Sequence, residues 1–378
     1  MTLTVPIPPV FFLPPSAVSL VCHSFSMFKI KKMKAKQFFF LLLLGSVFFS
    51  YSCKKNRTDC GSQNGDYSTG IFVVNEGGFG STGSITWHDP ATGETVQDVY
   101  GMENCGAVLG QFVQSLAFHN GKAYIVVNGA NKIVIVDAAT FEFIDTIGGL
   151  ALPRYFQPDP FISNRAYVSQ WGADGISGSL AVIDLDHNKV LKTVATGSGP
   201  EKMFVLNSDV LYVANSGGYG VDSTVAVFSM FVEAVQHKFV LPEKNPACLA
   251  INDASAVFAL CKGYYDDVNS TGWLGEFGPS AAGTPVDKYA DDLVSSPDGS
   301  TFYFLGGGAI WSYKNNTISR LFDQPAYGLA CHPVSGNLYC ADGKDFNSAG
   351  EVVIYKPDGT KVGSFPTGIA PGEIVIKG

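Results

Sequence analysis

Short apolar segments alternate with polar turns at a regular spacing along the chain after residue 66. Each unit of about 40–45 residues holds four such segments, with tight polar turns after the first and third and a glycine-rich loop after the second. The clearest unit has its segments at residues 115–119, 123–128, 132–137 and 142–147. These segments are rich in β-branched and aromatic residues, which favour strands. The pattern predicts an all-β chain of four-stranded units, as in a β-propeller.

The second strand of this unit recurs seven times, at residues 71–75, 124–128, 166–170, 211–215, 257–261, 302–306 and 338–342. The first unit has no inner strand of its own, whereas residues 373–377 form an apolar strand that belongs to no other unit. We therefore predict a seven-bladed β-propeller over residues 67–378, closed by pairing of the C-terminal strand into the first blade. Closure removes an exposed strand edge. The fifth unit is the weakest, because Gly275 interrupts its third strand at residues 273–277.

The N-terminal segment has a different composition. A basic run at residues 29–36 precedes an apolar run at residues 37–49, and Cys53 follows shortly after. This order is typical of a secretory signal, and the apolar run is short for a membrane span of about 20 residues. We interpret residues 1–52 as an over-extended start and a lipoprotein-type signal peptide, with Met27 or Met33 as the more ordinary first residue.

In this interpretation Cys53 becomes the lipidated first residue, and the polar residues 53–66 form a lipid-anchored flexible tether. An ordinary signal peptide cleaved nearby is the alternative. Removing the five lysines of residues 1–52 from the 25 basic residues leaves 20 against 33 acidic ones, a net charge of −13. This balance argues against nucleic acid as a partner.

The cysteines of the repeat region give no metal or haem motif, because no C-x-x-C spacing occurs. Cys331 and Cys340 flank the turn at residues 332–337 and could face each other across adjacent strands. Two interpretations stay open: a disulfide in an oxidising compartment, or two small buried apolar side chains.

The predicted function lies on one face of the ring. In a propeller, the loops between second and third strands share a face with the connections between blades, and here these loops carry aromatic residues among glycines and polar groups. Such a surface suits a polar, partly flat ligand. The predicted ligand-binding residues are Asn75, Glu76, Phe79, Gln111, Gln114, Asn128, Arg154, Tyr155, Gln170, Trp171, Asn215, Tyr219, Tyr264, Tyr265 and Phe346.

Two alternatives apply to these residues. The loop aromatics could merely pack over the blade ends. The amides Asn75, Asn128, Gln170 and Asn215, which we place at equivalent strand ends near the axis, could cap neighbouring backbone groups. The opposite face has short, standard turns, for example at residues 119–122 and 356–360, and we assign it a structural role.

Catalytic motifs are absent from the sequence: it has no G-x-S-x-G, no H-E-x-x-H and no phosphate-binding glycine loop before a helix. We therefore expect a non-enzymatic protein without a cofactor or metal. Two acidic pairs, Asp266 with Asp267 and Asp291 with Asp292, lie on or near the loop face. A calcium site is conceivable there, and a solvated loop is the simpler interpretation.

Several segments together resemble a known family: residues 70–80 with 84–86, 109–115, 124–128, and 152–155 with 166–170. They are similar to the YncE-like propeller lipoproteins of Bacteroidetes, and among them to the BtuG type, which captures cobalamin and passes it to a TonB-dependent outer-membrane transporter. The resemblance covers residues 67–378 and implies an outer-membrane lipoprotein that binds a corrinoid. Lys54 and Lys55 depart from the acidic surface-export signal expected after the lipidated cysteine, which leaves the cell surface and the periplasmic face both open.

The sequence thus predicts a non-enzymatic envelope lipoprotein that binds a corrinoid or another small polar ligand. A glycan-binding or protein-docking scaffold would use the same face without a deep pocket. A propeller lactonase or lyase would need a metal or a histidine–acid pair at the axis.

Overall fold

The computed structural model describes residues 65–278, 281–287 and 289–378. The chain divides into two compact units, residues 1–58 and 59–378, and the described residues belong to the second. Cys53, the predicted signal peptide and most of the predicted tether lie outside the described residues. Within the described part of the chain, no helix is both long enough and apolar enough to cross a membrane.

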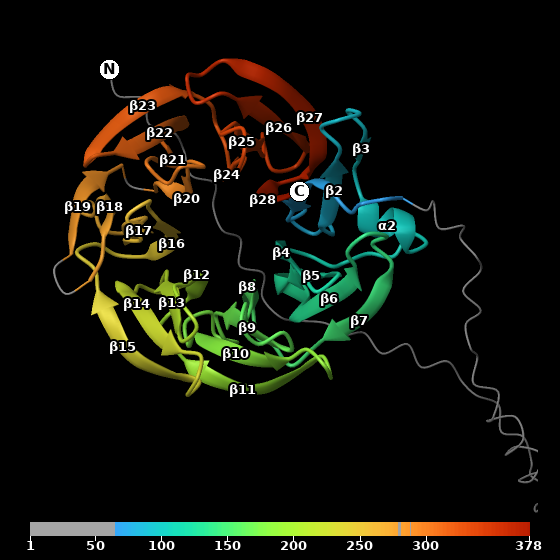
Figure 1. The fold of residues 1–378 in the computed structure, drawn as a ribbon, viewed down its shortest axis with the longest axis horizontal. Helices are drawn as coiled ribbons and strands as arrows, with labels where there is room; N and C mark the ends of the chain where they lie inside the picture. Colours follow the sequence, from blue (N-terminus) through green and yellow to red (C-terminus); the bar gives the residue numbers. More distant parts are fainter. Residues whose placement is uncertain (1–64, 279–280, 288) are drawn as a thin grey trace, which may run out of the picture. The chain divides into compact units, whose positions relative to one another are not determined.

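The described residues form seven antiparallel sheets of four strands each, arranged around one axis (Figure 1). The predicted seven-bladed propeller is therefore confirmed. Blade 1 holds β28 (Pro371–Lys377), β1 (Gly70–Asn75), β2 (Ser84–His88) and β3 (Thr95–Val96). Blade 2 holds β4 (Val113–His119), β5 (Lys122–Val127), β6 (Lys132–Asp137) and β7 (Phe143–Ile147). Blade 3 holds β8 (Pro153–Pro158), β9 (Arg165–Gln170), β10 (Ser179–Asp184) and β11 (Lys189–Ala195).

The remaining blades repeat this order. Blade 4 holds β12 (Pro200–Val205), β13 (Val210–Asn215), β14 (Thr224–Ser229) and β15 (Ala234–Val240). Blade 5 holds β16 (Pro246–Ile251), β17 (Val257–Cys261), β18 (Gly272–Glu276) and β19 (Ala282–Val286). Blade 6 holds β20 (Asp291–Ser295), β21 (Phe302–Gly306), β22 (Ala309–Lys314) and β23 (Thr317–Asp323). Blade 7 holds β24 (Gly328–Cys331), β25 (Leu338–Asp342), β26 (Ala349–Tyr355) and β27 (Lys361–Ile369).

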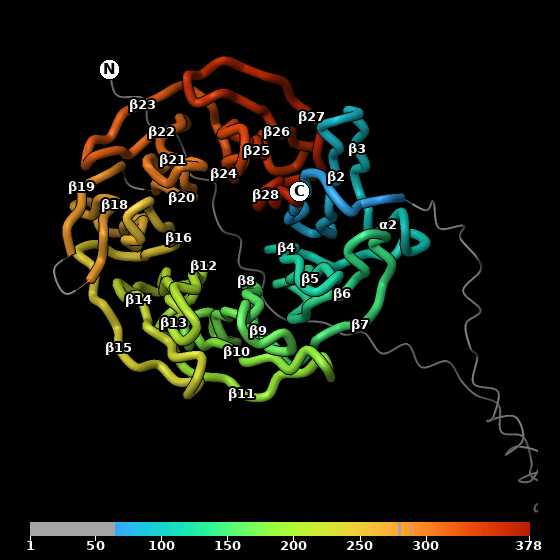
Figure 2. The backbone as a smooth tube through the Cα atoms, viewed as in Figure 1, coloured from blue at the N-terminus to red at the C-terminus, as the bar shows by residue number. Residues whose placement is uncertain are grey.

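Ring closure follows the prediction. The inner strand β28 pairs antiparallel with β1, with Ile376 opposite Ile71 and Ile374 opposite Val73. The tube in Figure 2 follows the chain once around the ring and shows the C-terminus back beside the first blade. Two short helical turns are also present, α2 (Val99–Glu103) after blade 1 and η1 (Asn128–Ala130) in blade 2.

Seven clusters of buried apolar side chains fill the seven interfaces between neighbouring sheets. The period-2 alternation of each strand explains how one strand serves two interfaces. On β1, Phe72 and Val74 pack against blade 2, whereas Ile71 and Val73 pack against blade 7. Because each sheet is buried on both faces, its central strands read as continuous apolar runs in the sequence.

The weak fifth unit is a complete blade, and its glycines explain why. Gly275 in β18 lies opposite Gly283 in β19. A Cβ atom at either glycine would approach the ring of Trp273 to 2.5–2.6 Å. The two glycines therefore make room for this indole, and its packing takes the place of the missing side chains.

The cysteines in the described blades are free, including Cys331 and Cys340. The disulfide considered for that pair is wrong. Cys340 is buried, as the small-apolar interpretation describes, whereas Cys331 is half-buried. In the β24–β25 register Cys331 faces Leu338 and Cys340 faces Leu329, so the two cysteines are diagonal neighbours. Diagonal pairs lie about 7–8 Å apart, beyond the usual reach of a disulfide.

Candidate ligand-binding site

A cavity of about 90 Å³ opens at the propeller axis, on the face that carries the loops between second and third strands. Polar and charged side chains dominate its wall. The lining residues are Glu76, Gln114, Arg154, Tyr155, Glu201, Lys202, Ala247, Cys248, Lys262, Asp291, Asp292, Tyr327, Gly372 and Glu373.

Most of these residues occupy one repeated position, the start of an inner strand. There the inner strand carries one extra residue relative to its neighbour, as between Pro153 and Phe156 in blade 3 or between Pro200 and Met203 in blade 4. The same irregularity occurs in blades 1, 2, 5 and 6. Bulges of this kind redirect side chains. Here they direct the residues after the strand start toward the axis.

A sharp backbone turn precedes these bulges. Phe112, Leu152, Asn245 and Ala370 adopt positive φ values of 52°, 50°, 59° and 54° immediately before their inner strands. Left-handed backbone is costly for residues with a side chain. In each case the carbonyl of that residue accepts a backbone hydrogen bond from the residue after the second strand, for instance Trp171 N to Leu152 O at 3.1 Å and Glu76 N to Ala370 O at 2.9 Å.

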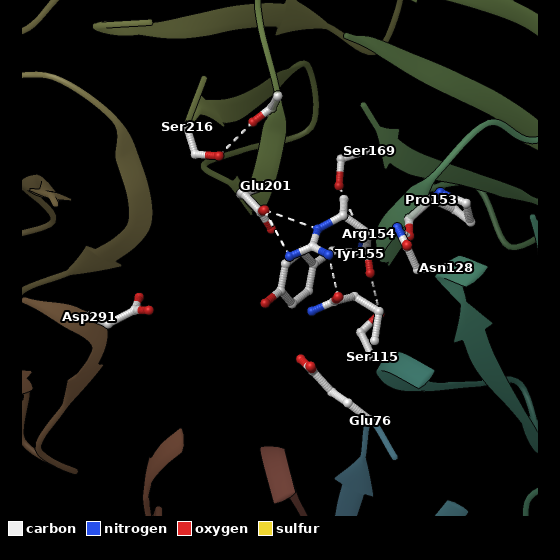
Figure 3. A network of polar contacts seen from close by, with 12 residues as sticks. Glu76, Ser115, Asn128, Pro153, Arg154, Tyr155, Ser169, Glu201, Ser216 and Asp291 are labelled. Carbon is white, nitrogen blue, oxygen red and sulfur yellow. Dashed lines mark hydrogen bonds and ion pairs between the residues drawn. The ribbon is translucent and has the colours of Figure 1, made fainter. Parts of the chain in front are cut away.

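Three ion pairs cross the cavity. Arg154 donates to Glu201 at 2.9–3.0 Å (Figure 3) and also to the Oε1 atom of Gln114. Lys202 pairs with Asp292, and Lys262 pairs with Asp291. Burial alone would lower the pKa of Lys202, but the Asp292 carboxylate raises it well above its usual value. Burial by itself would raise the pKa of Asp291. The charge and the hydrogen bond of Lys262 have the larger effect, so the pKa of Asp291 is lowered.

Asp291 and Asp292 therefore do not form a solvated loop, and that interpretation is corrected. They begin β20, and Asp292 is 9% exposed. The Asp292 carboxylate also accepts a hydrogen bond from the backbone N–H of Leu329 at 2.8 Å. Among the described residues, no group of three or more His, Cys, Asp or Glu side chains could hold a metal ion.

Three aromatic pairs lie in the loops of the face on which the cavity opens, and we call these residues the aromatic rim. Trp171 and Tyr219 meet edge to face with ring centroids 5.4 Å apart, and the Arg154 guanidinium lies 4.4 Å from the Trp171 ring centroid. Two further pairs are Tyr264 with Tyr265 and Tyr327 with Phe346, at 5.2 and 5.0 Å. Tyr219 is 72% exposed and Tyr265 66% exposed, so this rim presents rings to solvent.

The strand-end amides behave as the capping alternative describes. Asn75 donates to Ser84 O and Asn215 to Thr196 O, both at 3.3 Å, and Gln170 Oε1 accepts the backbone N–H of Ala151 at 3.0 Å. The three amides also donate to the hydroxyls of Thr86, Thr224 and Ser179 at 2.9–3.0 Å. All three lie opposite the first residue of an inner strand. Asn128 differs, because Val127 occupies that register position and Asn128 falls one residue later. The predicted equivalence of the four amides is therefore wrong for Asn128, whose side chain donates to Pro153 O at 3.0 Å.

The structure thus brings together only part of the predicted site. Glu76, Gln114, Arg154 and Tyr155 line the cavity. Trp171 contacts the lining residue Arg154, and Phe346 contacts the lining residue Tyr327. Tyr219, Tyr264 and Tyr265 lie in loops of the same face and do not line the cavity. Phe79 is 97% exposed and Gln111 is exposed, and neither lines the cavity. Asn75, Gln170 and Asn215 are buried and occupied by strand-end hydrogen bonds.

The sequence reasoning missed Glu201, Lys202, Lys262, Tyr327 and Glu373. A signal was available, because four inner strands begin with proline followed by two residues that face the axis region: Arg154–Tyr155, Glu201–Lys202, Ala247–Cys248 and Gly372–Glu373. Aligning the units on these prolines places all eight residues at the same two positions.

Comparison with known proteins adds a partial family match. Residues 69–245 match the model described as a domain of unknown function, DUF5074. No curated protein matches the chain. A quinonprotein alcohol dehydrogenase-like protein of Bacteroides thetaiotaomicron is similar, with a TM-score of 0.61, 17% identity, and coverage of 83% of this chain and 80% of that one.

Two further solved structures are similar to this chain to about the same degree. A candidate 6-phosphogluconolactonase of Bacteroides fragilis has a TM-score of 0.59 and 13% identity, covering 82% of this chain and 98% of that one. Hydrazine synthase of Kuenenia stuttgartiensis has a TM-score of 0.57 and 15% identity, covering 70% and 92%. At these identities the likeness extends to the fold alone. The chain is thus a seven-bladed β-propeller whose residues 69–245 resemble a domain of unknown function.

Proposed function

We propose that this protein is a non-enzymatic ligand-binding protein of the cell envelope, and that its ligand binds on the loop face over the axial cavity. One observation carries the proposal: six of the seven inner strands bulge at the same position, and their polar side chains converge on one cavity, on a face whose loops also expose aromatic rings. A concave site with a few convergent polar groups and aromatic walls is the usual form of a small-molecule site. No histidine is among the described residues that line the cavity, so the histidine–acid pair of a propeller lyase has no counterpart there.

A corrinoid is the ligand we propose first, because the resemblance of the sequence points to it and the rim chemistry suits it. A flat macrocycle can lie against the rings of Trp171, Tyr219 and Tyr265, and its amide side arms can meet the polar groups at the cavity mouth. The cavity itself is too small for a whole macrocycle, so the rim would carry most of the contact. A TonB-dependent outer-membrane transporter is the partner that would receive such a ligand.

We also propose that a lipid on Cys53 holds the propeller at the outer membrane. The acidic net charge of the chain without residues 1–52 fits a domain held away from anionic lipid. Cys105 is disulfide-bonded, which fits an oxidising compartment outside the cytoplasm. A Cys53→Ser variant should move from the membrane fraction to the soluble fraction; a variant that stays with the membrane contradicts the lipid anchor.

The proposed binding face can be tested by calorimetric titration of residues 59–378 with cobalamin. We expect Trp171→Ala and Tyr219→Ala each to weaken binding about tenfold, because aromatic anchors commonly contribute more than about 1 kcal/mol. Tyr155→Ala should also weaken binding, although Tyr155 lies in the cavity wall and its loss also enlarges the cavity.

His119→Ala and Asp137→Ala serve as controls at the other end of the blades. His119 contacts Ser163 O at 2.9 Å, and Asp137 caps a turn by accepting from the backbone N–H groups of Ala139 and Thr140. Both substitutions should leave the affinity unchanged. Loss of affinity in these two variants instead of in Trp171→Ala and Tyr219→Ala would show that the two faces are assigned the wrong way round.

A further inference from the structure

The charges in the axial cavity do not balance. Its three cations, Arg154, Lys202 and Lys262, are each paired with one carboxylate, from Glu201, Asp292 and Asp291 respectively. Two more carboxylates, Glu76 and Glu373, line the same cavity. Neither of them has a cationic partner within 4.0 Å among the described residues. The cavity therefore carries two carboxylates more than its own side chains neutralise.

Glu76 is fixed at one side of this cavity by neutral groups. Its carboxylate accepts a hydrogen bond from the Tyr327 hydroxyl at 3.1 Å, and its backbone is held by Ala370. Gly372 leaves the wall open here, since a Cβ atom at this position would lie 3.4 Å from the Tyr327 ring and 3.6 Å from Glu76 Oε1. Burial raises the pKa of Glu76, which means that its charge lacks adequate compensation.

Glu373 follows Gly372 on β28, the inner strand of blade 1. One oxygen of its carboxylate accepts the backbone N–H of Leu116 from β4 at 2.7 Å. Burial raises the pKa of Glu373 to about 7, and the nearby Lys202 and the Leu116 N–H offset this only in part. Lys202 is already paired with Asp292, so it cannot neutralise Glu373 as well.

We infer that the axial cavity binds an organic ammonium group, held by the carboxylates of Glu76 and Glu373 beside the rings of Tyr155 and Tyr327. An ammonium group supplies the missing charge, and tyrosine rings attract cations through their faces. An anionic ligand fits poorly, because it would have to displace a carboxylate from each cation that it approached. This inference goes beyond the proposed corrinoid site, because it concerns the cavity beneath the rim and not the rim itself.

Choline and its neutral isostere 3,3-dimethylbutan-1-ol are the probes that test the inference, because they share a shape and differ in charge. Calorimetric titration of residues 59–378 should show choline binding at least about tenfold tighter than the isostere. Equal binding of the two probes, or no binding of choline, would overturn the inference. Titration of the same protein with cobalamin is a separate test, so failure of one ligand to bind does not affect the conclusion about the other.

The variant Glu76→Gln/Glu373→Gln should abolish choline binding, because it removes both charges and keeps the acceptors for Tyr327 and Leu116. The matched control is Glu94→Gln/Glu142→Gln, which makes the same change of charge at two exposed positions on the opposite face. The control should bind choline as the unsubstituted protein does. Binding that survives in the cavity variant would contradict the inference, and the isostere comparison still decides if that variant fails to fold.

The pH dependence gives a further readout. Choline keeps its charge at all pH values, whereas Glu373 gains a proton as the pH falls through about 7. The charged groups near Glu373 are Lys202 and Asp292, which remain paired with each other. The affinity for choline should therefore fall as the pH is lowered from 8 to 6, because Glu373 loses its charge in this range. An affinity for choline that stays constant over this range would show that Glu373 does not bind the ammonium group.

Discussion

Deletion of residues 371–378 should unfold the propeller. These residues include the whole of β28, which supplies the inner strand of blade 1 and lies between β24 of blade 7 and β4 of blade 2. Without it, the buried residues Ile71 and Val73 lose their cross-strand partners and β1 becomes a free edge. The Lys377 ammonium also donates to Tyr67 O and Ala138 O at 3.0 and 2.7 Å, joining blades 1 and 2.

The expected loss exceeds about 5 kcal/mol, which is the lower end of the stability of ordinary domains. Circular dichroism on heating and size-exclusion chromatography would show no cooperative transition and an aggregated product. A circular permutant is the matched control, because Lys377 lies opposite Gly70 and the two ends of the propeller are therefore close. Joining these ends and opening the exposed turn at residues 297–299 keeps every strand and should keep the cooperative transition. A truncated protein that melts like the full chain would contradict the closure mechanism.

Substitution of Lys202 by Met should destabilise the propeller by about 3–5 kcal/mol, the usual cost of leaving a buried charge without its partner. Lys202 in β12 neutralises Asp292 in β20, and this carboxylate also holds the backbone of Leu329 in β24. Asp292 itself has a positive φ of 43°, a conformation that these contacts must maintain. The pair therefore links blades 4, 6 and 7 across the axis.

A double-mutant cycle separates this coupling from packing. Lys202→Met/Asp292→Asn should recover much of the stability lost in Lys202→Met, because residue 292 then carries no charge that needs the lysine. Urea unfolding followed by tryptophan fluorescence measures each variant. The control is Arg320→Met, which breaks an exposed ion pair with Asp323 and should change the stability little. A loss of stability in Lys202→Met as small as that in Arg320→Met would show that the Lys202–Asp292 pair does not hold the blades together.

The blades and the closure were predictable because a propeller repeats its hydrophobic pattern. Each second strand is buried on both faces, so segments such as residues 71–75 and 124–128 stand out as apolar runs. The inner strand of blade 1, at residues 373–377, was identified by the same apolar pattern at the C-terminal end of the chain. Even the fifth blade was recognisable, although the reason that its glycines are tolerated, the packing of Trp273 over Gly275 and Gly283, depends on a contact between two strands.

The cavity was less predictable, because its side chains point inward at bulges. Simple alternation along β12 or β20 does not show that Lys202 and Asp292 face the axis, since one extra residue shifts the register there. The partners are also far apart in sequence, 90 residues in the case of this pair. The amides Asn75 and Asn215 were the reverse case: polar residues at strand ends near the axis, whose side chains turn inward to the blade and not to the cavity.

Calorimetric titration of the unsubstituted residues 59–378 with cobalamin tests whether the loop face over the axial cavity binds a small ligand, with a corrinoid proposed first. We expect saturable heat with one site per propeller, and weaker binding by the Trp171→Ala variant. Absence of heat and of any change in the cobalamin absorption spectrum would contradict the corrinoid proposal, and saturable binding unaffected by Trp171→Ala would contradict the proposed face.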